Sequence, residues 1–185
     1  MVHQMRDELL SNPAKRAPIG MGLKGVTGVV FQINLKPPTP GERGLPKRRV
    51  ERAFVKKEGL VGDFNRWRHE EAVDDPRMAV LLMPLETIQE LNRERWPLRA
   101  GDLGENFTTK GIPYDSYVPG KRYRIGKAVV TVTKACDPCS NLYLLPQIGE
   151  DRDIVKAMYN RRGWYASVDE EGDVVTGDPI TEETS

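Results

Sequence analysis

The two cysteines of the chain, Cys136 and Cys139, form a C-x-x-C pair. A deprotonated thiol is a nucleophile and a soft ligand, so Cys139 suits a soft metal centre or a persulfide. The pair could also open and close a disulfide, or Cys136 could resolve a persulfide on Cys139. Buried, unreactive cysteines are the alternative. Zinc is a weaker hypothesis, because a structural site needs four ligands and the sequence offers one convenient histidine, His69, and no second C-x-x-C pair.

A predicted strand positions this pair. Residues 129–133 read Val-Val-Thr-Val-Thr, which favours an extended, packed segment. Asp137 and Pro138 end it, because proline has no N–H to donate and restricts the residue before it. The strand is therefore expected to hold the thiol of Cys139 in place while leaving its sulfur open to a ligand.

Length and charge narrow the class of protein. A chain of 185 residues fits one domain, and its net charge of +1 provides no global field for nucleic acid or an anionic membrane. We expect no nucleic-acid partner, and the basic run at residues 47–49 is interpreted as a solvated strand start. The sequence has neither an apolar run long enough to cross a bilayer nor a secretory start, so we expect no membrane association and a cytoplasmic location.

Short strands outnumber helices along the chain, which predicts a mostly β fold with a few helices (α+β), as a closed or partly open β-barrel. The expected strands are residues 25–35, with the odd-numbered residues from Thr27 to Leu35 facing inward, 48–57 and 77–83, and residues 164–175 form a hairpin. Helices are expected after Pro84, ending before Pro97, and between residues 150 and 162. The predicted divisions are a mobile lead-in at 1–24, one domain at 25–180 and a tail at 181–185.

The order of several motifs resembles the MOSC domain family, named after the C-terminal part of molybdenum-cofactor sulfurases. The resemblance covers roughly residues 25 to 180. The chain departs from the family pattern in three places: Phe64 and Cys136 stand where arginine is usual, and Glu70-Glu71 stand where glycines are usual. The carrying pieces are Gly59-Leu-Val-Gly-Asp63, His69, Ala79-Val-Leu-Leu-Met-Pro84, Gly101-Asp-Leu-Gly-Glu-Asn-Phe-Thr108, Tyr123-Arg-Ile-Gly126, Pro138-Cys139, Arg162-Gly-Trp-Tyr165, Gly172 and Gly177-Asp178.

The resemblance implies a MOSC-type β-barrel that binds molybdenum cofactor (molybdopterin), with Cys139 as metal ligand or sulfur carrier. Glu105 and Asn106 would read the polar edge of the pterin, and Thr108 would add a hydroxyl contact. Lys134 or Arg77 would pair with the cofactor phosphate, and Lys134 would favour the thiolate of Cys139. His69 would donate to the phosphate or transfer a proton. For these residues an ordinary turn or a solvated surface is the alternative.

Three functions stay open at this point. The first is reduction of N-hydroxylated or N-oxide substrates, as in similar stand-alone bacterial proteins, with a separate electron donor because no flavin or iron–sulfur motif is visible. The second is a sulfur carrier in which Cys139 receives a persulfide from a pyridoxal phosphate-dependent cysteine desulfurase. The third is a binding module that holds the cofactor without turnover.

Overall fold

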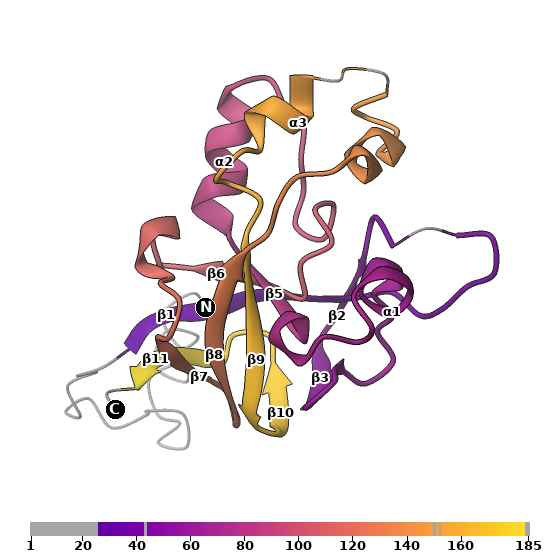
Figure 1. Cartoon of the computed structure of the whole chain (residues 1–185). Coiled ribbons are helices and arrows are strands. Elements are labelled where there is room, and N and C mark those ends of the chain that lie inside the picture. The colour runs from indigo at the N-terminus through magenta and orange to yellow at the C-terminus, as the bar shows by residue number, and fades with distance from the viewer. Residues whose placement is uncertain (1–25, 43, 150, 152, 184–185) are drawn as a thin grey trace, which may run out of the picture.

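Seven strands in the described part of the chain close into a β-barrel (Figure 1). The structure is a computed structural model and describes residues 26–183 except 43, 150 and 152. Strand β5 is parallel to β6, whereas every other neighbouring pair in the barrel is antiparallel. Round the ring the strands are β1 (Val26–Leu35), β6 (Phe107–Lys110), β5 (Val80–Pro84), β9 (Trp164–Glu170), β8 (Ala128–Ala135), β7 (Arg122–Ile125) and β11 (Pro179–Glu183), which pairs with β1.

Four further strands and six helical segments complete the described part of the fold. Strand β2 (Arg48–Val50) pairs with the end of β1, and a separate sheet contains β10 (Gly172–Val175), β3 (Arg52–Lys56) and β4 (Gly59–Leu60). The helices are α1 (Arg66–Glu71), α2 (Leu85–Arg93) and α3 (Asp153–Ala157), with 3-10 turns η2 (Pro76–Met78), η3 (Tyr114–Ser116) and η4 (Ser140–Leu144). Helix α2 makes the crossover between the parallel strands β5 and β6.

Two hydrophobic clusters support this arrangement. The larger fills the barrel with side chains from its strands, including Ile33, Leu82 and Val130. The second joins α2 to α3 and η4 through Ile88, Ile154 and Leu142, and Figure 1 shows α2 and α3 together at the top of the view, above the barrel strands. The predicted β-barrel with few helices is confirmed.

Two predictions about the strands are wrong. The inward face of β1 does not follow the odd-numbered residues, since Val30 and Ile33 are buried while Phe31 is 40% exposed. A register shift against β6 between Val30 and Gln32 reverses the alternation, as an extra residue in a bulge does. Strands β9 and β10 also form no hairpin, because β9 pairs with β5 and β8 whereas β10 pairs with β3.

Several boundaries differ from those expected from the sequence. The segment at 48–57 is divided into β2 and β3, the strand expected at 77–83 begins only at Val80 after η2, and the last helix is limited to α3. Strand β11 extends through residues 181–183, so the expected boundary at residue 180 falls inside a strand. The lead-in expected at 1–24 lies outside the described residues.

Candidate functional site

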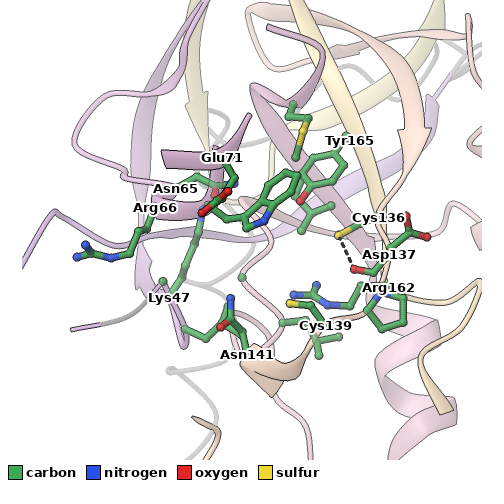
Figure 2. A pocket seen from close by; sticks show the side chains of 18 of the residues that line it. Lys47, Asn65, Arg66, Glu71, Cys136, Asp137, Cys139, Asn141, Arg162 and Tyr165 are labelled. Atoms are coloured by element: carbon green, nitrogen blue, oxygen red, sulfur yellow. Dashed lines mark hydrogen bonds between the residues drawn. The ribbon is translucent and has the colours of Figure 1, made fainter. Parts of the chain in front are cut away.

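A cavity of about 710 Å³ lies beside the end of β8 and is the candidate site (Figure 2). Its walls come from stretches that are far apart in sequence: the loop of Gly41 and Leu45, the start of α1, and residues 134–139. Arg162 and Tyr165, just before and within β9, also line it. A concave space of this size can enclose a small molecule or cofactor.

Strand β8 brings both cysteines to the cavity wall. The strand ends at Ala135, and the Cys136 N–H then donates to the carbonyl of Gly163 at 2.9 Å, which ties this segment to the start of β9. Cys139 is exposed and is the N-cap residue of η4. The strand and the 3-10 turn therefore hold the Cys139 thiol where a ligand in the cavity can reach it.

The two thiols have different surroundings. Cys136 is only 7% exposed. Its thiol donates a hydrogen bond to the Asp137 carbonyl oxygen, with 3.7 Å between sulfur and oxygen (Figure 2). Burial raises the pKa of the Cys136 thiol, against the opposing effect of the Arg162 charge. Both thiols are free, and the backbone of Cys139 is extended, with φ −139° and ψ 170°. This geometry favours Cys139 over Cys136 as the reactive thiol.

Arg162 is a cavity-lining residue that was not predicted from the sequence, where it stood only within the Arg162-Gly-Trp-Tyr165 motif. Its side chain lies in the cavity wall together with both cysteines (Figure 2). The residue is only 5% exposed, yet its Nε and Nη1 atoms have no hydrogen-bond partner among the described residues. Burial and missing partners are three-dimensional properties, and the only sequence signal was the Arg-Gly-Trp-Tyr motif that carried the family resemblance.

Of the two cations expected near a phosphate, only Lys134 lines the cavity. Its ammonium group lies 5.9 Å from the centre of the Tyr165 ring and 3.9 Å from the carboxylate of Asp75. The Arg77 guanidinium instead pairs with Asp75, with 2.9 Å between Nη2 and Oδ2. The structure therefore separates Arg77 from the two thiols and keeps Lys134 with them.

Glu105, Asn106 and Thr108 are buried behind the cavity and do not line it. The Glu105 carboxylate accepts hydrogen bonds from the Gly101 N–H and the Thr108 hydroxyl, both at 2.7 Å. Asn106 accepts from the N–H of Leu81, a residue of the cavity wall, at 3.1 Å. The three side chains thus support the wall from behind, which differs from the expected direct contact with a cofactor.

His69 also lies outside the cavity. Its Nδ1 atom is 3.0 Å from an Asp74 carboxylate oxygen, and both side chains are more than half exposed. The His69 ring is 5.5 Å from the ring of Phe64, which does line the cavity. The structure therefore does not bring His69 together with the cysteines.

Lys47 belongs to the cavity wall, so its interpretation as a solvated strand start is wrong. The residue is 7% exposed, and its ammonium lies 2.5 Å from the Asp63 carboxylate. Asp63 also accepts from the Lys36 N–H at 2.7 Å and from the Asn106 amide at 2.8 Å. The Asp63 carboxylate thus pairs with the charge of Lys47.

Comparison with known proteins identifies the family. The sequence profile of the MOSC domain matches residues 69–181, so the chain belongs to the MOSC domain family. None of the curated protein sequences matches it. The resemblance drawn from the motifs is confirmed.

Solved structures share the fold. YiiM from Geobacillus stearothermophilus is 26% identical, with a TM-score of 0.64 over 85% of this chain and 75% of that one. YiiM from Escherichia coli is 23% identical, with a TM-score of 0.65 over 85% and 70%. YuaD from Bacillus subtilis is 18% identical, with a TM-score of 0.66 over 85% of this chain and 97% of that one.

Two kinds of feature are absent from the described residues. No helix there is long and apolar enough to cross a membrane. In the same part of the chain, no three side chains of His, Cys, Asp or Glu come together as a metal site. Among the described residues, Cys139 is thus the exposed thiol of the cavity wall and does not belong to a closed ligand set.

Proposed function

We propose that this MOSC protein binds a molybdopterin-type cofactor in the cavity, with Cys139 as a ligand of the metal, and reduces N-hydroxylated or N-oxide substrates. The observation that carries the proposal is the exposed Cys139 thiol in the wall of a cavity of about 710 Å³. Thiolate sulfur is a ligand that soft metal centres prefer. A cofactor that brings its own ligands needs only one such donor from the protein.

The residues of the cavity fit such a group. Arg162 and Lys134 place two positive charges at the same wall, which suits the anionic parts of the cofactor. Half-exposed Trp67 on α1 supplies a flat apolar surface against which a ring system can pack. A soft donor, two cations and an aromatic face are what a sulfur-rich, phosphorylated, planar cofactor would require.

The cofactor, when bound, supplies the two-electron chemistry that cleaves an N–O bond. The chain's own residues bind and orient it: Cys139 holds the metal, and Arg162 fixes anionic oxygens. The buried hydrogen bonds of Glu105 and Asn106 keep the wall rigid behind these groups. The proposed partners are the small-molecule substrate and a separate electron donor.

Reduction of an N-hydroxylated base tests the proposal. Protein from a host that makes molybdenum cofactor is mixed with a chemical electron donor and the base, and the reduced base is measured by chromatography. We expect turnover by the wild type and its loss in Cys139→Ser, because serine does not replace a soft sulfur ligand. Cofactor binding without turnover would leave only the binding module, and equal turnover in Cys139→Ser would reject the role of Cys139.

The exposure of Cys139 also supports a second function, a sulfur carrier, because a partner protein can reach an exposed thiol. A pyridoxal phosphate-dependent cysteine desulfurase would then pass a sulfane sulfur to Cys139 as a persulfide. Mass spectrometry of protein incubated with such an enzyme and cysteine would show one added sulfur on Cys139. A metal-free protein that carries this sulfur would favour the carrier over the reductase.

A further inference from the structure

The separate sheet of β10, β3 and β4 has one face that is exposed and carries basic and apolar side chains together. Strand β3 is its middle strand. Its side chains alternate, with Ala53 and Val55 turned into the core and Arg52, Phe54 and Lys56 exposed. Because every second side chain of a strand points to the same side, the three exposed side chains form a row.

Val61 widens this row into a surface. Its N–H donates to the Phe54 carbonyl at 2.9 Å, which continues the pairing of β3 with β4 by one residue. Residues that lie opposite each other on neighbouring strands share a face, and Phe54 and Val61 are 39% and 51% exposed. We call the four residues Arg52, Phe54, Lys56 and Val61 the β3 face.

The β3 face lies in a basic part of the chain. Residues 48–61 contain five basic residues and two acidic ones, whereas the whole chain has a net charge of only +1. In the described part of the chain neither Arg52 nor Lys56 forms an ion pair, and Glu51 pairs instead with Arg49 at 2.8 Å. Asp173 on β10 lies opposite Phe54 and adds one carboxylate beside the face. The two free cations therefore favour a partner with an acidic surface.

The β3 face lies close to the cavity wall. Val61 comes three residues before Phe64, which lines the cavity, so their Cα atoms are at most about 11 Å apart. Helix α1, whose start also lines the cavity, is tied to the turn between β3 and β4, because the Arg68 guanidinium donates to the Glu58 carbonyl. A protein bound to the β3 face is thus brought next to the ligand space.

We propose that the β3 face is the docking surface for the protein that delivers electrons to the cavity, and that this donor is a small acidic flavoprotein of the flavodoxin type. The inference rests on the proposed function, because only the reductase needs a separate electron donor. Reduction of one N–OH group to N–H takes two electrons and two protons from solvent and releases water. The reduced flavin of the donor supplies the electrons as it becomes oxidised.

The size and composition of the β3 face suit such a partner. Electron-transfer complexes have small interfaces, and opposite charges bring the two proteins together quickly. Aromatic residues and arginine are enriched in the centres of interfaces. Phe54 between Arg52 and Lys56 provides this combination on a sheet whose other face is fixed in the core.

Binding of a purified bacterial flavodoxin to the full-length protein tests the proposal by titration calorimetry. We expect saturable binding by the wild type that weakens at least about tenfold between about 50 and about 300 mM sodium chloride, because salt screens exposed charges. At about 100 mM salt, Arg52→Glu/Lys56→Glu should bind at least about tenfold more weakly than the wild type. Phe54→Ser should also weaken binding but keep the salt dependence, because both cations remain.

Arg93→Glu/Lys110→Glu is the matched control. It makes the same change of charge at exposed positions on α2 and β6, outside the β3 face. Since distant charges are largely screened at about 100 mM salt, this control should bind flavodoxin like the wild type. Circular dichroism checks that every variant is folded.

Two binding results would overturn the proposal. One is a lack of flavodoxin binding by the wild type, and the other is equal affinity in folded Arg52→Glu/Lys56→Glu and in the control. A short single-stranded RNA is titrated in parallel, because exposed cations also bind nucleic-acid phosphates. Binding of the RNA but not of flavodoxin, dependent on Arg52 and Lys56, would make nucleic acid the partner instead.

Turnover separates failure of the docking surface from failure of the proposed function. Reduction of an N-hydroxylated base is driven either by reduced flavodoxin or by sodium dithionite. We expect Arg52→Glu/Lys56→Glu to lose at least about tenfold in flavodoxin-driven turnover and to keep the dithionite-driven rate. If both rates equal those of the control, the docking surface fails and the reductase stands. If neither donor drives turnover but flavodoxin binding depends on the β3 face, the reductase fails and the docking surface stands.

Discussion

At the scale of single residues, the two thiols should react at very different rates. Cys139 is exposed, whereas Cys136 is 7% exposed and burial raises its pKa, so its reactive thiolate form is rare. We expect iodoacetamide to modify Cys136 in the native protein at least about tenfold more slowly than Cys139. Peptide mass spectrometry over a time course measures both rates, and urea-unfolded protein, in which the rates should converge, is the control. Equal alkylation rates of Cys136 and Cys139 in the native protein would contradict the difference in burial between the two thiols.

Glu105 should make stability depend on pH. Burial raises the pKa of its carboxyl, so the folded protein keeps a proton that the unfolded chain releases as pH rises. The stability that this proton contributes is fully present below the unfolded pKa of about 4.3 and is lost as pH rises through the folded pKa. Glu105→Gln does not ionise but keeps an acceptor for the Gly101 N–H, so it should become more stable relative to the wild type as pH rises above the unfolded pKa of Glu105.

Urea unfolding at several pH values measures this difference. Glu105→Ala is the contrasting variant, since it leaves the Gly101 N–H and the Thr108 hydroxyl without their acceptor and should cost about 1–3 kcal/mol. A constant difference between Glu105→Gln and the wild type at every pH would show that Glu105 is ionised equally in the folded and unfolded states.

At the scale of elements, the turn that begins at Gly101 packs closely against the segment containing Lys47. The Lys47 N–H donates to the Gly101 carbonyl at 2.9 Å. Gly101 has φ +94°, and a Cβ atom there would lie 2.6 Å from the Lys47 carbonyl oxygen. This close approach supports the wall that Lys47 forms.

Alanine substitution distinguishes two effects at Gly101, its left-handed backbone conformation and its close contact with the Lys47 carbonyl oxygen. Gly120 has φ +92° but open space around it, so Gly120→Ala reports the backbone conformation alone, at about 1–3 kcal/mol. Gly101→Ala should lower the free energy of unfolding by more than Gly120→Ala, because the new methyl group also meets backbone. Urea unfolding compares the variants, and equal losses would show that the close contact is relieved at no cost.

The sequence predicted correctly those elements whose conformation is determined mainly by their own residues. The β-branched run that forms β8 and the Pro84-led pattern of α2 lie where they were predicted, because local propensity and packing favour the same conformation. The hairpin at β9 and β10 was wrong, since its strands pair with distant partners. The prediction of which face of β1 points inward was wrong, because a bulge against β6 cannot be recognised from the sequence of one strand.

At the scale of the whole molecule, the barrel closes through partners at opposite ends of the described chain, such as Gly28 and Ile180. The β-rich pattern indicated a barrel, but the pairing order depends on non-local contacts. The same limit applies to the candidate site. The sequence identified Cys139, Cys136 and Lys134, which line the cavity, whereas Arg162 and Lys47 join them only after folding brings distant segments together.

Molybdenum content is the most direct test of the central claim. Wild type, Cys139→Ser and Cys136→Ser are purified from a host that makes the cofactor, and metal and pterin are measured per protein chain. The exposed Cys139 thiol as the metal ligand predicts molybdenum in the wild type and in Cys136→Ser and its loss in Cys139→Ser. Molybdenum retained equally by Cys139→Ser would contradict this account.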